Sequence, residues 1–116
     1  MVDILNIIFA FLSIGLGAVG WLMTGYTMNR LDLHDGGSGM GKSEIRAASG
    51  ALFVGLGIGA LLIGTPAAYA MIGCAWGGAA VGRATSLALD GVTRDKVVFF
   101  AVEAVVGIAA VAVNLS

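Results

Sequence analysis

Residues 97–115 read VVFFAVEAVVGIAAVAVNL and carry a single charged side chain, Glu103. A helix needs about 20 mostly apolar residues to cross a bilayer, and this run is long enough. Three further stretches have the same character, at about residues 4–26, 45–64 and 66–89. The sequence therefore predicts an all-α fold, in which residues 1–116 form a single multipass domain and four helices form a transmembrane bundle.

The composition of the whole chain also indicates a membrane protein. Of its 116 residues, 59% are hydrophobic and 11% are charged, whereas about 25% of the residues in a soluble domain are charged. A chain this short could not bury so much apolar surface in a core of its own. The net charge of -1 argues against nucleic-acid binding. The single cysteine, Cys74, lies in an apolar run and is expected to be a buried thiol.

The basic residues predict how the bundle lies in the membrane. If each helix crosses once, the two links at residues 27–44 and 90–96 lie on the same face. These links and the adjoining helix ends hold all six basic residues, namely Arg30, Lys42, Arg46, Arg83, Arg94 and Lys96. The positive-inside rule then places both links in the cytoplasm and both termini outside. The first apolar run has no basic segment before it, so we expect it to be retained rather than cleaved.

Two helix starts have recognisable signals. Pro66 suits the first turn of a helix, because its missing N–H would be unsatisfied there in any case. Thr65 and Pro66 are therefore expected to form a tight hairpin between two helices. Ser43 is expected to cap the helix that begins near residue 45, with Glu44 in its first turn.

Residues 36–43 read GGSGMGKS and match the phosphate-loop pattern G-x-x-x-x-G-K-[ST]. That pattern binds nucleotides between a strand and a helix of an α/β sheet, and this chain offers no sheet. We therefore expect neither nucleotide binding nor any other cofactor. The first interpretation is a flexible glycine loop. The alternative is an anion or a lipid headgroup held by Lys42 and Ser43.

The polar segment before this loop holds three potential metal ligands, Asp32, His34 and Asp35. Carboxylates and imidazole suit several divalent metals. Nothing else in the chain supplies a convincing fourth ligand. We therefore expect a solvated loop and no metal site.

Arg83 and Glu103 are charged residues inside predicted spans. Each lies about six residues from the helix end that adjoins the short link, which places both about 9 Å below the same interface. A charge left alone in hydrocarbon costs about 2.5 kcal/mol or more, so we predict that the two form an ion pair.

A wider polar cluster is a further hypothesis. It would add Arg46, Asp90 and Glu44 to the predicted pair. Two interpretations stay open: the cluster locks the last two helices together, or it is an intramembrane site for an anionic ligand, a lipid headgroup or a proton.

Small residues recur at four-residue steps in two of the predicted helices. One ridge is Ala47, Ala51, Gly55 and Gly59, and two shorter ridges are Gly73 with Gly77 and Gly78 with Gly82. Such ridges let membrane helices approach closely. We expect them to be contacts within the bundle rather than a dimer face.

Two segments resemble the signatures of a family of small bacterial membrane proteins. They are SEIRAASGALF at residues 43–53 and GRATSLALDG at residues 82–91, and Glu103 also resembles the family pattern. The family pattern often has an acidic residue and a second glycine where this chain has Ala48 and Ala51. The family is named only as a domain of unknown function (four-three-four-five). The resemblance implies a four-helix protein of the bacterial inner membrane and supplies no reaction.

Three functions are compatible with these features. The first is an accessory or scaffold subunit that packs against a larger membrane complex, which the small size and the glycine ridges favour. The alternative is a protein that binds or transports a small anionic or lipid ligand through the Arg/Glu cluster. A membrane enzyme acting on lipid has the least support, because no nucleophile–base pair stands out. We expect a non-catalytic protein in the lipid bilayer, with a protein partner there or as a homo-oligomer.

Overall fold

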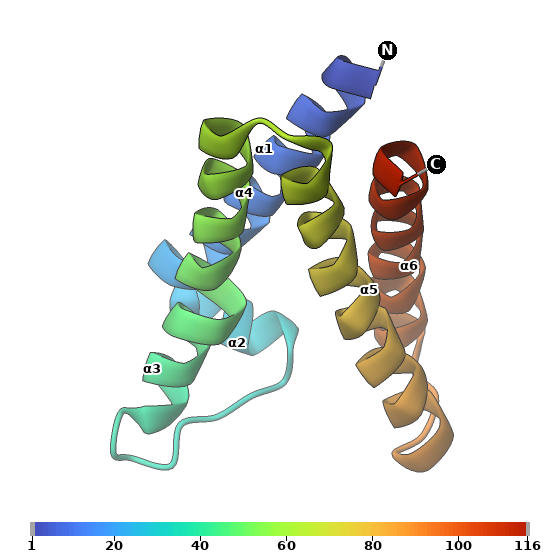
Figure 1. Cartoon of the computed structure of the whole chain (residues 1–116). Coiled ribbons are helices and arrows are strands. Elements are labelled where there is room, and N and C mark those ends of the chain that lie inside the picture. Colours follow the sequence, from blue (N-terminus) through green and yellow to red (C-terminus); the bar gives the residue numbers. More distant parts are fainter. Residues whose placement is uncertain (1, 116) are drawn as a thin grey trace. The chain divides into compact units, whose positions relative to one another are not determined.

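The computed structural model describes residues 2–115, which are helical with short connections (Figure 1). In chain order the elements are α1 (Val2–Leu22), α2 (Thr24–Arg30), α3 (Met40–Arg46), the π-helical turn η1 (Ala47–Ala51), α4 (Leu52–Ile63), α5 (Pro66–Leu89) and α6 (Arg94–Leu115). No strand occurs within residues 2–115, so the predicted all-α class is confirmed. The described chain forms two compact units, residues 2–9 with 63–115 and residues 10–62.

Three helical runs are long and apolar enough to cross a membrane: Val2–Leu22, Met40–Ile63 and Arg94–Leu115. They support the assignment to membrane proteins. The fourth predicted span, α5, has 24 residues and hence sufficient length. It is less apolar than the others because Arg83 and several hydroxyl and glycine residues interrupt it. A crossing by α5 therefore stays a prediction.

The first unit is built on the antiparallel pair of α5 and α6, which lie side by side (Figure 1). Helix α5 begins and ends where predicted, since Pro66 occupies its first turn and the Thr65 side chain accepts a hydrogen bond from the Ala68 N–H. A Cβ added to Gly107 would lie 2.6 Å from the backbone nitrogen of Gly77, and one added to Gly73 would lie 2.8 Å from that of Val111. Gly73 and Gly107 permit this approach because they lack a Cβ, so the expected helix contact is confirmed at Gly73. A Cβ on Gly77, Gly78 or Gly82 would meet no atom within 4 Å, so the expected packing through these three glycines stays a prediction.

The same unit includes the first turns of α1, which two asparagines join to α6. The Asn6 Nδ2 donates to Asn114 Oδ1 and the Asn114 Nδ2 donates to Asn6 Oδ1, both at 2.8 Å. The Asn114 Nδ2 also donates to the Ala110 carbonyl at 2.7 Å. Asn6 is 4% exposed, so the reciprocal pair satisfies amide groups that would otherwise be buried at a cost.

In the second unit, the rest of α1 packs against η1 and α4. A Cβ on Gly17 would lie 2.7 Å from the Gly50 carbonyl oxygen, and the Ser13 hydroxyl donates to the Phe53 carbonyl at 2.8 Å. The contact therefore does not run along the ridge Ala47, Ala51, Gly55 and Gly59. A Cβ on Gly55 or Gly59 would meet no atom within 4 Å, so these two glycines take no part in the contact with α1, and their packing within the bundle stays a prediction.

Two helix ends lie three or four residues from their expected positions. The first helix ends at Leu22 instead of residue 26, and α2 follows after a break at Met23. The Thr24 hydroxyl lies 3.0 Å from the carbonyls of both Gly20 and Trp21, and such bonds commonly bend helices. Helix α6 begins at Arg94, three residues before the predicted residue 97.

The start of α3 corrects the predicted cap. The helix begins at Met40, so Ser43 and Glu44 lie within it and Ser43 is not the cap. The residue before the helix, Gly39, has a φ of 81° that favours glycine. The Asp35 carboxylate accepts hydrogen bonds from the Gly39 and Gly41 N–H groups, both at 2.9 Å, and so replaces the expected cap.

Candidate functional site

Arg83 on α5 and Glu103 on α6 form the ion pair that the sequence predicts. The Arg83 Nε lies 3.2 Å from Glu103 Oε1, and the Arg83 Nη2 lies 3.2 Å from Glu103 Oε2. The guanidinium carbon also lies 5.3 Å from the centre of the Phe99 ring, within the range of a cation–π contact. The two side chains are 31% and 15% exposed. The fork engages both carboxylate oxygens, so the pair ties α5 to α6 with its charges matched.

The other members of the predicted polar cluster lie elsewhere along the chain. Asp90 is the exposed residue at the C-terminal end of α5 and forms no ion pair in the part of the chain that the structure describes. Glu44 and Arg46 belong to the second unit, so a cluster that joins them to Arg83 stays a prediction.

A cavity of about 570 Å³ lies between α5 and α6, and we call it the apolar groove. Its lining is small or aliphatic apart from one aromatic and one hydroxyl residue: Gly77, Ala80, Val81, Ala84, Thr85, Phe100, Ala104 and Ile108. Arg83 is two residues from Val81, about 200° round α5. Neither Arg83 nor Glu103 lines the apolar groove, although each lies three residues from a residue that does, Ala80 and Phe100 respectively.

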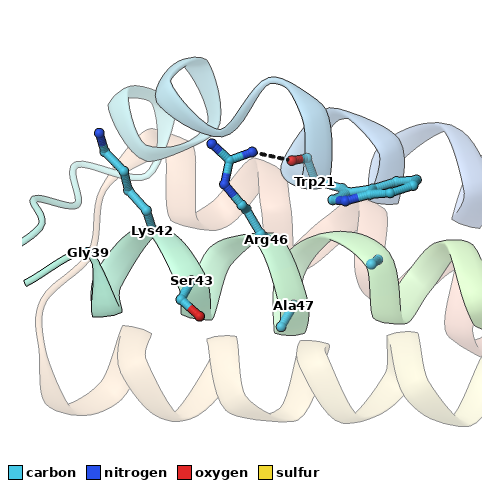
Figure 2. Close-up of a pocket in the computed structure, with 7 residues that line it drawn as sticks. Trp21, Gly39, Lys42, Ser43, Arg46 and Ala47 are labelled. Atoms are coloured by element: carbon cyan, nitrogen blue, oxygen red, sulfur yellow. Dashed lines mark hydrogen bonds between the residues drawn. The ribbon is translucent and has the colours of Figure 1, made fainter.

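A second cavity, of about 490 Å³, lies in the second unit, and we call it the cationic groove. It is lined by Trp21, Gly39, Lys42, Ser43, Arg46, Ala47 and Ala51. Figure 2 shows the Lys42 and Arg46 side chains extending from the same side of the helix, as their spacing of four residues requires. The Arg46 Nη1 donates to the Trp21 carbonyl at 2.9 Å, so this arginine also joins α3 to the end of α1.

The polar segment between α2 and α3 has one firmly held side chain. The pKa of Asp35 is lowered, chiefly because the Gly39 N–H and then the Gly41 N–H donate to its carboxylate, with a smaller contribution from the charge of Lys42. His34 and Asp32 approach to 3.8 Å and are almost fully exposed. Within residues 2–115, no group of three or more metal-ligating side chains comes together.

Sequence analysis did not identify three features of these sites. They are the Asn6–Asn114 pair, the bond from Arg46 to the end of α1, and the Asp35 cap. The lone asparagines in otherwise apolar runs were the available signal for the first. The expected burial of Cys74 is also wrong, because this thiol is exposed on α5.

The fold and its sites define a class: small helical proteins with apolar spans and few charges, some of them paired between helices. The chain matches the family model described as Domain of unknown function (DUF4345) over residues 1–114, and it belongs to that family. The resemblance drawn from the sequence is thereby confirmed. No curated protein and no solved structure matches the chain.

Proposed function

We propose that the protein is a non-catalytic, four-span subunit of the bacterial inner membrane that packs the apolar groove against a transmembrane helix of a larger complex. The observation that carries the proposal is the groove itself. Four of its lining residues, Gly77, Ala80, Ala84 and Ala104, have little or no side chain. Small residues lower the barrier to close helix approach in lipid, where packing rather than water drives association.

The rim of the apolar groove supports the same occupant. Val81 is 69% exposed and Ile108 is 70% exposed, so both edges present branched apolar side chains to whatever lies outside. The groove contains no charge, and the Thr85 hydroxyl is already bonded to the Val81 carbonyl at 2.9 Å. An apolar helix that inserts several bulky side chains would fill it without burying an unpaired polar group.

The ion pair favours this proposal over ligand transport through Arg83 and Glu103. Both Glu103 oxygens are engaged by the guanidinium, so an incoming anion would have to displace a bonded carboxylate. A structural role in holding α5 to α6 needs no such displacement. We therefore assign the pair to the framework that keeps the apolar groove open.

Photo-crosslinking in native membranes tests the proposal. A photoreactive residue at Val81 or Ile108 is expected to capture one defined membrane protein. The control is the same residue at Val102, which is also exposed, at 46%, but lies about 120° round α6 from Ile108. Equal capture from all three positions, or capture of lipid alone, would refute the proposed subunit role.

A groove-filling substitution gives an independent test. Ala84→Phe is expected to abolish the crosslink from Ile108, because the added ring obstructs the part of the apolar groove that both residues line. Val102→Phe adds the same ring outside the groove and is expected to leave the crosslink intact. A crosslink that survives Ala84→Phe, in a protein whose melting temperature is unchanged, contradicts the proposal.

A further inference from the structure

The cationic groove carries an excess of positive charge, and the proposed subunit role does not require that excess. Two basic side chains, Lys42 and Arg46, line it, and none of its seven lining residues is acidic. Like charges four residues apart on a helix repel each other by a few tenths of a kcal/mol. The site therefore carries excess positive charge that an anion would offset.

The surroundings of the two cations leave that charge uncompensated. Arg46 bonds to a neutral carbonyl, that of Trp21. The Asp35 carboxylate lies near enough to Lys42 to feel its charge, but its oxygens already accept from Gly39 and Gly41. Within residues 2–115, neither Lys42 nor Arg46 has a carboxylate oxygen within 4.0 Å.

The cationic groove also lies where the chain changes from polar to apolar. No charged residue follows Arg46 until Arg83, and the helical run Met40–Ile63 is apolar enough to span a bilayer. Trp21 is 42% exposed at the end of the span Val2–Leu22, and indole rings favour the headgroup level of a membrane. The two cations thus belong at the depth of lipid phosphates.

A row of small residues, here called the apolar lane, extends along the helix away from the two cations. Ala47 and Ala51 line the groove, and Gly55 and Gly59 follow at four-residue steps with no atom within 4 Å of an added Cβ. This small-residue face leaves room for a narrow aliphatic chain along the helix. A ligand that matches the whole feature has an anionic head and a hydrocarbon tail.

We propose that the cationic groove binds an anionic phospholipid, with its phosphate between Lys42 and Arg46 and the start of an acyl chain over Ala47 and Ala51. Trp21 packs beside the ester region. Ser43 and Ala47 project from the other side of the helix in Figure 2, so the phosphate contact falls to the two cations, and Ser43 lies beside the start of the acyl chain. This ligand site lies in the second unit and is independent of the apolar groove.

Lipid titration of the purified protein in mild detergent tests the proposal, with thermal stabilisation as the readout. Phosphatidylglycerol is expected to raise the melting temperature, and phosphatidylcholine with the same acyl chains is expected not to. Lys42→Gln with Arg46→Gln should weaken the apparent affinity for phosphatidylglycerol about thirtyfold, given the typical worth of two basic residues near a headgroup. The control, Arg30→Gln with Arg94→Gln, removes the same charge from two exposed positions outside the groove.

Single substitutions separate lipid binding from folding and from simple anion binding. Lys42→Gln removes a side chain that forms no hydrogen bond in the described structure, so it should weaken binding without lowering the melting temperature in the absence of lipid. Ala51→Phe should weaken binding by blocking the lane while both cations remain. Three results would overturn the proposal. They are equal stabilisation of the protein by phosphatidylglycerol and phosphatidylcholine, stabilisation of the Lys42→Gln/Arg46→Gln variant by phosphatidylglycerol as large as that of the unaltered protein, and the same stabilisation by inorganic phosphate alone.

Discussion

The charged side chains that adjoin the apolar helices fall into two groups according to what each one meets. Arg83 meets a carboxylate through two bonds and an aromatic face, so its charge is matched inside the first unit. Lys42 and Arg46 meet no carboxylate within the described residues and line an open groove. The first arrangement suits a framework and the second suits a ligand, which is why the two proposals assign them different roles.

The losses of stability from removing the two partners of the ion pair should not add up. Glu103→Gln is expected to destabilise the protein by about 1–3 kcal/mol, since it leaves the Arg83 charge unmatched in a largely apolar setting. The double variant with Arg83→Gln should lose less than the sum of the two single losses, by about 1 kcal/mol. Unfolding of the purified protein in mixed micelles measures all three values. Strictly additive losses would contradict a structural ion pair.

The Asp35 cap predicts a pH-dependent start of α3. The hydrogen bonds from Gly39 and Gly41 lower the folded-state pKa of Asp35 below its unfolded value. The stabilisation is therefore present at pH above the unfolded pKa, and it is lost as the pH falls through the lowered folded value. NMR shifts of the Gly39 and Gly41 amides should titrate together at a pH below the ordinary aspartate pKa. Asp35→Asn should abolish that titration, whereas titration of both amides in this variant would refute the cap.

At the scale of elements, glycines determine which helix faces can meet. Gly17 and Gly15 both lie in α1 and differ in what a side chain would encounter. A Cβ on Gly17 would lie 2.7 Å from the Gly50 oxygen and 2.8 Å from the Val54 nitrogen, whereas one on Gly15 would meet nothing within 4 Å. The contact face of α1 is therefore specified by position and not by glycine content.

Two matched substitutions in α1 test that specification. Gly17→Ala is expected to destabilise the second unit by about 1–3 kcal/mol, because backbone atoms must move apart. Gly15→Ala should be neutral or stabilising by up to about 1 kcal/mol, because alanine is the better helix former. Thermal unfolding of the two variants measures the difference. A Gly17→Ala protein as stable as Gly15→Ala would show that α1 does not pack on Gly50 and Val54.

Local chemistry explains which elements the sequence predicts well. Helix α5 is bounded by a threonine cap and Pro66, both signals within a few residues, and its predicted ends match the structure. The true start of α3 depends on a left-handed Gly39 and on Asp35 four residues away, and the helix-forming pattern does not contain either feature. The π-helical turn Ala47–Ala51 is likewise invisible to a pattern of four-residue steps, so the predicted ridge missed the face that packs.

The side-chain pairs between distant parts of the chain also differ in how well the sequence predicts them. Arg83 and Glu103 were predictable because a short link brings two charges to one depth. The Asn6–Asn114 pair joins residues 108 positions apart, and nothing in the sequence specifies that α1 reaches α6. Its reciprocal geometry follows only from the folded unit, where each amide finds both a donor and an acceptor.

At the scale of the whole molecule, the number of membrane crossings depends on α5. Three runs are apolar enough to span without further argument, and α5 has the length but carries Arg83. The ion pair with Glu103 lowers the cost of placing that arginine in lipid, since a paired charge is far less unfavourable there than a lone one. We therefore expect α5 to cross.

Cysteine accessibility in intact cells tests this crossing. In a Cys74→Ala background, Ser38→Cys lies between α2 and α3, and Val92→Cys lies between α5 and α6. If all four runs cross, both positions lie in the cytoplasm, and a membrane-impermeant thiol reagent should label them only after permeabilisation. Ala67→Cys, in the first turn of α5, should be labelled from outside.

If α5 does not cross, the chain crosses the membrane one time fewer before residue 92. Val92→Cys should then be labelled from outside, while Ser38→Cys stays protected. Labelling of Val92→Cys in intact cells would therefore refute the four-span topology, and protection of both link positions would require that α5 carries the paired Arg83 through the bilayer.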